Sequence, residues 1–371
     1  MKILMLLENA LPDIRVENEI YSLTKVGLHV ILVHKDKDKF PMPKWIYKSS
    51  VTALKLPFYF NWWREALRPV LAKQKFDSVH VHDLPLAKIG YEISQKYHIP
   101  FILDLHENYP ALLENSIHTK TILGRLLCSI RQWKNYERKY VGLASQVITI
   151  CQESANRLDI EYGRYSHIVQ NTINLDTVPR IVYKPAPIKG ILRLFYGGGI
   201  NKHRGLQVVI EAMQILQQRN IFIQFEIIGE GSYKKNLINL VASKGIIGIH
   251  FHGQKLFPDF MKILSESNIA IIPHLMNDNN NASSPHKLFQ YMYSKVPVIC
   301  SDCDSLARII QECNCGFIYQ NDSIEQLAAL LIFIDENRQL LARGINGQKA
   351  VIDKYNWEND SKELLKIYEN A

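Results

Sequence analysis

The chain has 371 residues, 47% of them hydrophobic and 22% charged, which is enough for two domains with separate cores. The net charge of +8 favours an anionic partner: a nucleotide, a phosphorylated lipid, a membrane surface or a nucleic acid. The longest apolar runs, such as residues 327–334, are far too short to span a membrane, which excludes an integral helical membrane protein.

The N-terminal residues, MKILMLLENALP, do not resemble a signal peptide because their apolar stretch is very short and Glu8 closes it. They predict a buried strand followed by a loop. We therefore expect a cytoplasmic protein, with the inner face of the plasma membrane as a further candidate location.

Strand-like apolar runs then alternate with helical periods along the whole chain. The first half predicts strands at 2–6, 29–34, 78–83, 100–106 and 146–150, with helices around 16–27 and 87–97. The second half predicts strands at 192–197, 224–229, 249–253, 269–273 and 296–300, with helices at 205–218, 232–244, 257–266 and 285–294. This alternation predicts an α/β protein with parallel sheets covered on both faces.

Residues 172–190 contain three prolines and little periodicity, so they read as a linker. Two doubly wound, Rossmann-like domains are expected, an N-terminal one over 1–175 and a C-terminal one over 190–350. Ligands of such sheets bind at the carboxyl ends of the strands, and between domains that face each other across a central cleft.

Two glycine-rich turns follow strands in the second half. In GGINKHRG (198–205), Gly198 and Gly199 allow close approach of a ligand, and Lys202 and Arg204 add positive charge, which suits a diphosphate. The alternative is a flexible loop with two solvated cations. Gly229 and Gly231 form a turn that suits either a nucleotide or a tight connection.

The segment SSPHKLFQY (283–291) predicts a helix N-terminus suited to an anion. Ser284 is expected as N-cap and Pro285 as the first helical residue, with Lys287 in the first turn and Gln290 on the same face. The alternative is an ordinary capped helix with an exposed lysine. We favour a site because this segment shares its edge of the sheet with the loop at 198–205.

Histidines and carboxylates mark two strand ends in the first half. His80, His82 and Asp83 end one strand, and Asp104, His106 and Glu107 mark the end of the next. A lone histidine is usually structural, but two clusters that face one cleft favour a functional site. Their spacing matches no zinc signature, so no metal is expected.

Cys300, Cys303, Cys313 and Cys315 leave a zinc site as an alternative, but the spacing departs from that of a zinc ribbon, and a strand and a loop account for the first pair. Aromatic and basic residues mix at 58–75 and 120–140, which indicates either membrane contact or amphipathic helices with solvated basic faces. The segment WWRE at 62–65 is the better membrane candidate.

Several motifs in this order resemble the retaining glycosyltransferases of group 1 (family 4), which have the GT-B fold. They are PDIRVENE (12–19), HVHD (80–83), LHEN (105–108), VQNTIN (169–174), GGGINKHRG (197–205), IIGEG (227–231), SSPHKLFQYMYSKVPVICSD (283–302) and YNWENDSKELLKIYE (355–369). The resemblance covers nearly the whole chain. It implies transfer of a sugar from a nucleotide-diphosphate sugar to a hydroxyl acceptor, such as a lipid-linked or surface polysaccharide glycan, without a metal or other cofactor and without nucleic acid.

The resemblance also implies roles for individual residues. His106 matches a histidine near the transferred sugar, while Arg204 and Lys287 match cations that stabilise the leaving diphosphate. The donor-binding set would be Gly198, Gly199, Lys202, Gly229, Gly231, Ser283, Ser284 and Gln290. The acceptor-side set would be Asp13, Arg15, His82, Asp83 and Glu107. The helix within 351–371 would cross back to the N-terminal domain.

This chain departs from the family pattern at three positions. Gly199 stands where the family has an arginine, and Ala282 and Gln290 stand where it has paired glutamates. These departures keep open a degenerate relative that binds a nucleotide, a glycan or a partner enzyme without turnover. A nucleotide-sugar epimerase with the same fold is a third hypothesis.

Overall fold

The computed structural model describes residues 1–35, 47–51, 59–114, 129–178 and 190–369. Its contacts divide the chain into two compact units. Unit 1 comprises Met1–Asn171 and Trp357–Ala371, and unit 2 comprises Thr172–Asn356. Most of the predicted linker, residues 179–189, lies outside the described residues.

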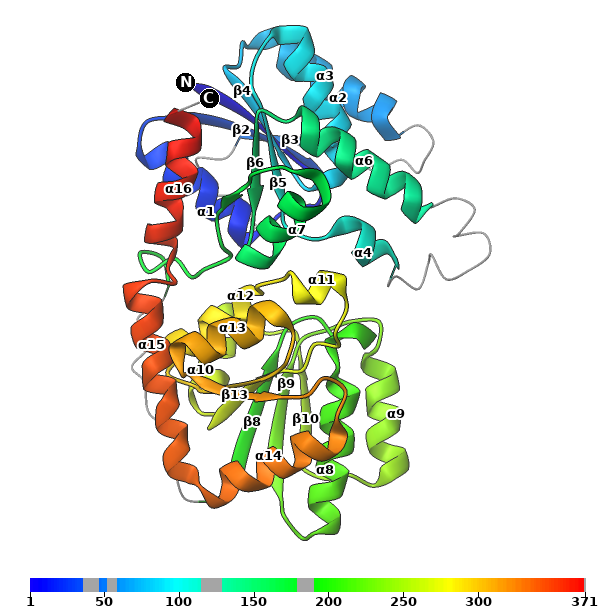
Figure 1. Ribbon diagram of the computed structural model, residues 1–371, viewed down its shortest axis with the longest axis vertical. Helices are drawn as coiled ribbons and strands as arrows, with labels where there is room; N and C mark the ends of the chain where they lie inside the picture. The colour runs from blue at the N-terminus through cyan, green and yellow to red at the C-terminus, as the bar shows by residue number, and fades with distance from the viewer. Residues whose placement is uncertain (36–46, 52–58, 115–128, 179–189, 370–371) are drawn as a thin grey trace. The chain divides into compact units, whose positions relative to one another are not determined.

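The described part of unit 1 forms one parallel sheet of seven strands in the order β3-β2-β1-β4-β5-β6-β7 (Figure 1). The strands are β1 (Lys2–Leu7), β2 (His29–Lys35), β3 (Tyr47–Val51), β4 (Ser78–His82), β5 (Phe101–Leu105), β6 (Gln146–Thr149) and β7 (His167–Ile168). The helices are α1 (Ile14–Lys25), α2 (Tyr59–Lys73), α3 (Ala87–Tyr97), α4 (Tyr109–Glu114), α6 (Ile130–Leu143), α7 (Gln152–Tyr162) and α16 (Trp357–Glu369).

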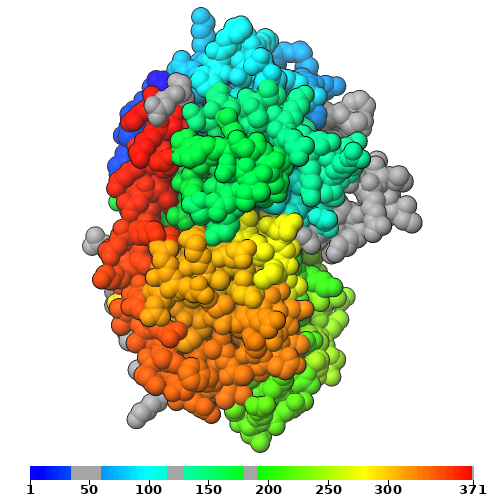
Figure 2. Space-filling model, viewed as in Figure 1, coloured from blue at the N-terminus to red at the C-terminus, as the bar shows by residue number. Residues whose placement is uncertain are grey.

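Two apolar layers lie on the two faces of this sheet. Successive residues of β1 alternate between them, since Leu4 and Leu6 belong to one layer and Ile3 and Met5 to the other. Helices α2, α3 and α6 contribute to the first layer, and α1 and the C-terminal helix α16 to the second. Helix α16 also contacts β7, and Figure 2 shows its red atoms directly against green atoms of unit 1.

The described part of unit 2 forms a second parallel sheet, of six strands, in the order β10-β9-β8-β11-β12-β13. The strands are β8 (Leu192–Gly197), β9 (Ile223–Ile228), β10 (Ile249–Gly253), β11 (Ile269–Ile272), β12 (Val298–Ser301) and β13 (Gly316–Tyr319). The helices are α8 (Leu206–Gln218), α9 (Lys234–Lys244), α10 (Phe257–Ser265), α11 (Asp278–Asn281), α12 (His286–Tyr293), α13 (Asp304–Cys313), α14 (Ile324–Glu336) and α15 (Arg343–Asp353).

The predicted α/β class with two doubly wound domains is confirmed. In unit 1 the strand order reverses between β1 and β4, and in unit 2 it reverses between β8 and β11. A ligand of such a sheet binds beyond the carboxyl ends of the two strands at this switch point. Each unit therefore has one place where a site is expected from topology alone.

No helix in the described part of the chain combines the length and hydropathy that a membrane span requires.

Candidate active site

The switch point of unit 1 gathers a buried cluster of charged and aromatic side chains. Arg15 and Glu19 come from α1, His80 and His82 from β4, and Asp104 from β5. All five are at most 6% exposed. Helix α1 is fixed there by Asp13, whose side chain accepts hydrogen bonds from the backbone N–H groups of the first turn. This cap starts α1 at Ile14, two residues before the predicted start.

Arg15 is the centre of the cluster. Its Nε and Nη2 donate to the two oxygens of Asp104, each at 2.9 Å, and its Nη1 donates to the carbonyl of Val169 at 2.6 Å. The Nε atom also lies 3.1 Å from Oε1 of Glu19. Burial opposes the charge of Arg15, but the two carboxylates outweigh it and raise the pKa of the guanidinium.

His106 follows β5 and is the partly exposed member of the group, with 12% of its side chain accessible. Its Nε2 lies 3.1 Å from Oδ2 of Asp104, and its Nδ1 lies 3.6 Å from Oδ2 of Asp83. Burial alone would lower the pKa of His106, but Asp83 and Asp104 raise it to about 10. The ring is therefore an imidazolium at neutral pH.

The other histidines of the cluster are neutral. Burial and then the neighbouring His80 lower the pKa of His82 to about 3, and burial also lowers that of His80. The two buried carboxyl groups, Glu19 and Asp104, also differ in charge. Burial and then Asp104 raise the pKa of Glu19 well above its usual value, whereas Arg15 and His106 overcome burial and lower that of Asp104. Asp104 is thus the carboxylate of the pair and Glu19 the neutral acid.

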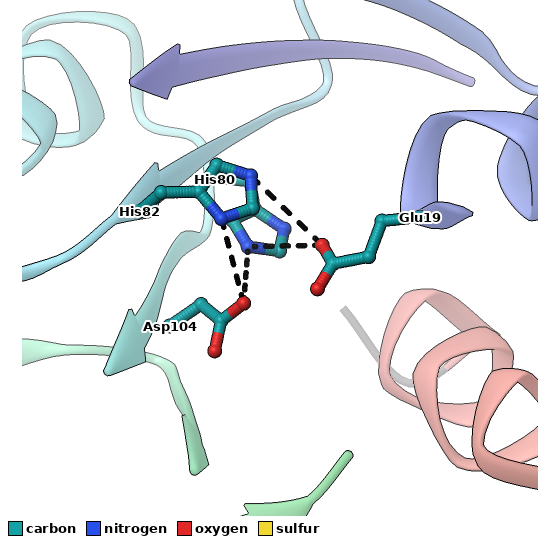
Figure 3. A group of neighbouring side chains, drawn as sticks. All are labelled: Glu19, His80, His82 and Asp104. Atoms are coloured by element: carbon teal, nitrogen blue, oxygen red, sulfur yellow. Dashed lines mark ion pairs between the residues drawn. The ribbon is translucent and has the colours of Figure 1, made fainter. Parts of the chain in front are cut away.

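Glu19, His80, His82 and Asp104 are drawn in Figure 3, and their possible ligand atoms all lie within 4.8 Å of one another. In ligand type alone they could hold a divalent metal. Arg15, however, already binds both oxygens of Asp104 and lies against Glu19. A divalent cation would stand beside this fixed guanidinium, so the donor set fits protons and hydrogen bonds better than a metal.

Asp83 has an unusual backbone. Its φ of 63° lies in a region that non-glycine residues rarely adopt. Two hydrogen bonds stabilise this backbone conformation. The N–H of Asp83 donates to the carbonyl of Asp104 at 2.8 Å, and its Oδ1 accepts from the N–H of His106 at 3.1 Å. Glu107 follows in the loop before α4. The structure therefore brings His82, Asp83 and His106 together, as the strand-end pattern predicted, and adds Arg15, which the family resemblance implied.

The switch point of unit 2 is built from two glycine loops that lie against each other. The N–H of Gly198 donates to the carbonyl of Ile228, and that of Ile200 donates to the carbonyl of Glu230, both at 2.9 Å. A Cβ on Gly229 would lie 1.9 Å from the carbonyl oxygen of Gly198, and one on Gly231 would lie 2.2 Å from that of Ile200. Both glycines are therefore required by loop packing, whatever ligand they contact.

Lys287 points into this switch point from the first turn of α12. Its Nζ lies 4.1 Å from the centroid of the Tyr196 ring and 3.0 Å from the place of a Cβ on Gly198. This Nζ is buried and has no hydrogen-bond acceptor among the described residues. Burial, and next the charge of Arg204, lower the pKa of Lys287 well below its usual value. A buried ammonium without an acceptor needs an anion.

Arg204 approaches the same place from the short 3-10 turn Lys202–Arg204, which follows β8. Its Nη1 lies 3.0 Å from Nε2 of His274, which follows β11 on the other side of the switch. Burial and then Arg204 lower the pKa of His274 well below its usual value, so the ring is neutral and Nε2 accepts this bond. Lys202 is exposed at the edge of the turn.

The start of α12 corrects the predicted cap. Helix α12 begins at His286, with Pro285 as N-cap in an extended conformation (φ −72°, ψ 138°), so Pro285 is not the first helical residue. Ser284 is not the cap, and its buried hydroxyl has no hydrogen-bond partner in the described part of the chain. The carbonyl of Ser283 accepts from Ser305 on α13 at 2.5 Å. Gln290 lies one turn after Lys287 and is 6% exposed.

Two other sequence interpretations change. The four cysteines of unit 2 do not belong to the cluster of possible metal ligands found among the described residues. In α2, Trp63 is fully buried in the core of unit 1 and Trp62 packs partly against it. The helical period turns the bulky side chains of WWRE toward the sheet, so this segment does not present an aromatic band for a membrane.

The sequence analysis missed three residues. Glu19 carries a signal, since it stands four residues after Arg15 on one helix face. His274 also carries one, since it follows a strand at the switch point. Tyr368, which contacts His80 from α16, carries none, because 288 positions separate the two residues.

Two sequence profiles match most of the chain. One, described as "Glycosyltransferase Family 4", matches residues 16–177, and the other, "Glycosyl transferases group 1", matches residues 186–368. The chain is a group 1 glycosyltransferase. The second profile covers the glycine loops, Arg204, Lys287 and Tyr368, and the first covers the buried cluster of unit 1 from Glu19 to His106 but begins just after Arg15.

This glycosyltransferase is similar to curated enzymes over most of its length. It is 22% identical over 312 residues to the phosphatidyl-myo-inositol mannosyltransferase of Mycolicibacterium smegmatis, which covers 81% of this chain and 73% of that one. It is 23% identical over 303 residues to an uncharacterized glycosyltransferase of Methanocaldococcus jannaschii, covering 81% and 77% of the two chains.

Solved structures share the fold of the glycosyltransferase. Sucrose-phosphate synthase from Thermosynechococcus elongatus superposes with a TM-score of 0.81 at 15% identity, over 100% of this chain and 98% of that one. The Anabaena protein HepE in complex with UDP-glucose superposes with a TM-score of 0.74 at 14% identity, over the whole of both chains. These likenesses support the GT-B fold.

Proposed function

We propose that this glycosyltransferase moves a sugar from a nucleotide-diphosphate sugar to a hydroxyl acceptor with retention of the anomeric configuration. The observation that carries the proposal is the buried Nζ of Lys287, which lies against Gly198 without an acceptor. Arg204 adds a second cation to the same switch point. Two cations at the carboxyl ends of parallel strands suit a diphosphate.

The chemistry requires stabilisation of the leaving diphosphate. As the bond between the anomeric carbon and the phosphate oxygen breaks, negative charge grows on the diphosphate. Arg204, and Lys287 once it has gained its proton beside the bound anion, would stabilise that charge. The acceptor oxygen forms the new bond on the same face of the sugar, and its proton passes to an oxygen of the leaving phosphate. The N–H groups at the start of α12 would add hydrogen bonds to the diphosphate.

Unit 1 would supply the acceptor side. Arg15 and His82 are buried, so their role would be to support the site and not to contact the acceptor. Asp13, Asp83, His106 and Glu107 remain as candidates for direct contact. His106 would act as a cation, with its Nδ1 proton available because Asp83 lies 3.6 Å away.

The relatives suggest which substrates to try first. Anabaena HepE binds UDP and UDP-glucose in solved structures, so a uridine nucleotide is the first donor to test. Relatives include a mannosyltransferase for phosphatidyl-myo-inositol and the amylovoran biosynthesis glycosyltransferase AmsK of Erwinia amylovora. We propose a lipid-linked or polysaccharide glycan as acceptor, without nucleic acid or a metal.

Membrane contact is part of this proposal, in a cytoplasmic enzyme at the inner face of the plasma membrane. It would use the exposed arginines of α2, Arg64 and Arg68, because Trp63 is buried in the core. These arginines pair with Glu92 and Glu65. Vesicles of phosphatidylglycerol should bind the protein at low salt and release it at high salt. Equal binding to neutral and anionic vesicles, or no binding to either, would contradict this part.

The transfer itself is tested with a panel of UDP-, GDP- and CMP-sugars. Water serves as the acceptor, because the natural acceptor is not identified. Proton NMR should show slow hydrolysis of one donor, with the retained anomer of the free sugar appearing before mutarotation. Appearance of the inverted anomer would refute retention. No hydrolysis and no binding of any nucleotide sugar would refute the donor class.

A further inference from the structure

The buried cluster of unit 1 reaches the C-terminal helix through one tyrosine. The hydroxyl of Tyr368, on α16, lies 2.5 Å from Nδ1 of His80. Tyr368 is 6% exposed and His80 is fully buried, and their rings stack with centroids 6.1 Å apart. A helix near the end of the chain thus contacts the charged residues that surround His106.

The contact selects one tautomer of His80. Nε2 of His80 faces Oε2 of Glu19 at 3.7 Å and Oδ2 of Asp104 at 3.8 Å. A proton on Nε2 points at the carboxylate oxygen of Asp104, whereas a lone pair there would be repelled by that charge. With that proton on Nε2, Nδ1 is the acceptor and the Tyr368 hydroxyl donates to it. The opposite tautomer would leave the phenol proton without an acceptor among the described residues.

The same tautomer directs the Nε2 proton of His80 toward Glu19. The two oxygens of Glu19 and the Nε2 of His80 make no other hydrogen bond within the described residues.

The charges around His106 then balance. Asp83 and Asp104 face the two nitrogens of its ring, Arg15 compensates Asp104, and His82 lies 3.2 Å from Nε2. Glu19 is the remaining carboxyl, and it is fully buried beside Arg15 and His80.

We infer that Tyr368 and His80 are positioning residues for His106. Tyr368 holds the tautomer of His80, His80 orients the Glu19–Asp104 pair, and Asp104 fixes the His106 imidazolium for the transfer reaction. The C-terminal helix would therefore act on the chemistry of unit 1 as well as on its stability. This inference rests on the proposed function for its kinetic consequence, but its structural content is independent of any substrate.

The wild-type protein provides the first test. Nitrogen-15 NMR of histidine side chains distinguishes the two neutral tautomers from the imidazolium. At pH 7 we expect His80 in the Nε2–H form and His106 doubly protonated. An Nδ1–H form of His80, or a neutral His106, would overturn the inference even if no donor or acceptor is ever found.

The variant Tyr368→Phe removes the phenol oxygen and keeps the ring. We expect a mixture of His80 tautomers, a lower titration point for His106, and kcat reduced about tenfold with donor KM within about twofold. Tyr162→Phe is the control, because Tyr162 also donates a hydrogen bond from its hydroxyl, at 2.6 Å to Glu137 in a part-buried place of the same unit.

Both variants lose one hydrogen bond and should lose comparable stability. The inference fails if Tyr368→Phe changes only the melting temperature, as its control does, and leaves the His106 titration and kcat at wild-type values. If Tyr368→Phe does not fold, the tautomer of His80 and the charge of His106 in the wild-type NMR spectrum decide whether the inference holds. Absence of turnover in every protein would remove the kinetic consequence only, and would count against the proposed function.

Discussion

Lys287 and His106 show how opposite environments set the charge of two cationic side chains. The Nζ of Lys287 is buried with no hydrogen-bond acceptor in the part of the chain that the structure describes, so burial and then the charge of Arg204 lower its pKa. His106 is also largely buried, but Asp83 and Asp104 face its ring, so its pKa rises to about 10. The first residue is prepared to gain a proton with an anionic ligand, and the second already holds one.

The raised pKa of His106 predicts the pH dependence of the enzyme. Because the folded value is about 10 and the usual value is 6.5, His106 stays charged through neutral pH. We expect no change in kcat from this group near pH 6.5, and a loss only as pH approaches about 10.

The same shift links folding to pH. The stability that His106 contributes is fully present below pH 6.5 and is lost as pH rises to about 10. Denaturant melts between these values should show this decline in wild type and a weaker one in His106→Gln. A kcat profile that follows a single pKa near 6.5 would contradict this charge assignment.

Gln290 allows a test of the donor ribose contact. If its amide accepts a hydrogen bond from a ribose hydroxyl, Gln290→Glu should leave nucleotide binding unchanged or tighten it by about 1 kcal/mol, because a carboxylate is the stronger acceptor. Calorimetric titration with the preferred nucleotide measures the change. A large loss of affinity in the folded variant would mean that the amide acts as a donor that an acid cannot replace.

Much of the candidate site could be predicted at the residue scale from strand ends. Asp83, His106 and Arg204 all follow apolar runs, and the carboxyl end of a parallel strand is where a doubly wound sheet binds its ligand. The sequence does not show that both histidines of β4, His80 and His82, lie in the core. His82 was expected to face an acceptor, but the alternation of β4 and the overlying helices bury it completely.

At the scale of elements, the two glycine loops of unit 2 pack against each other and depend on each other for their conformation. Gly231→Ala would place a Cβ 2.2 Å from the carbonyl oxygen of Ile200, and backbone on both sides prevents relaxation. We expect a loss of about 2 kcal/mol in the free energy of unfolding and weaker nucleotide binding.

Gly199→Ala is the matched control for this loop. A Cβ there would have its nearest neighbour at 3.6 Å, the Nδ2 of Asn201. Thermal melts of the two variants should therefore differ clearly, with Gly199→Ala close to wild type. Equal stability of the two would show that the loops are not packed in this way.

The sequence predicted the long elements better than the short ones. Strands β3, β7 and β13 were missed. The first has the polar sequence YKSSV, the second has only two residues, and the third is the four-residue GFIY. The start of α12 was predicted from the preference of serine for caps and of proline for first turns. In the structure Pro285 keeps an extended ψ of 138°, so helical hydrogen bonding begins after it.

At the scale of the whole molecule, the alternation of strands and helices was sufficient to predict two doubly wound sheets. Unit 1 includes both ends of the chain, and the helix within 351–371, which only the family resemblance assigned to the N-terminal domain, lies in it. The assignment of α16 to unit 1 depends on long-range packing, such as the bond from the Trp357 indole to Ser22 at 2.8 Å. Local sequence patterns contain no information on a pair so distant in the chain.

The central claim is that the carboxyl edge of the second sheet binds a nucleoside diphosphate through Lys287. Calorimetric titration of the full chain with UDP and GDP tests it most directly, with Lys287→Met beside Lys235→Met, an exposed lysine of α9. We predict proton uptake on binding by the wild type, seen as an enthalpy that depends on the buffer, because an anion raises the lowered pKa of Lys287. Lys287→Met should lose this dependence and bind about 30-fold more weakly, equivalent to about 2 kcal/mol, while Lys235→Met matches wild type. Equal affinity in both variants, with no buffer dependence in the wild type, would contradict the account.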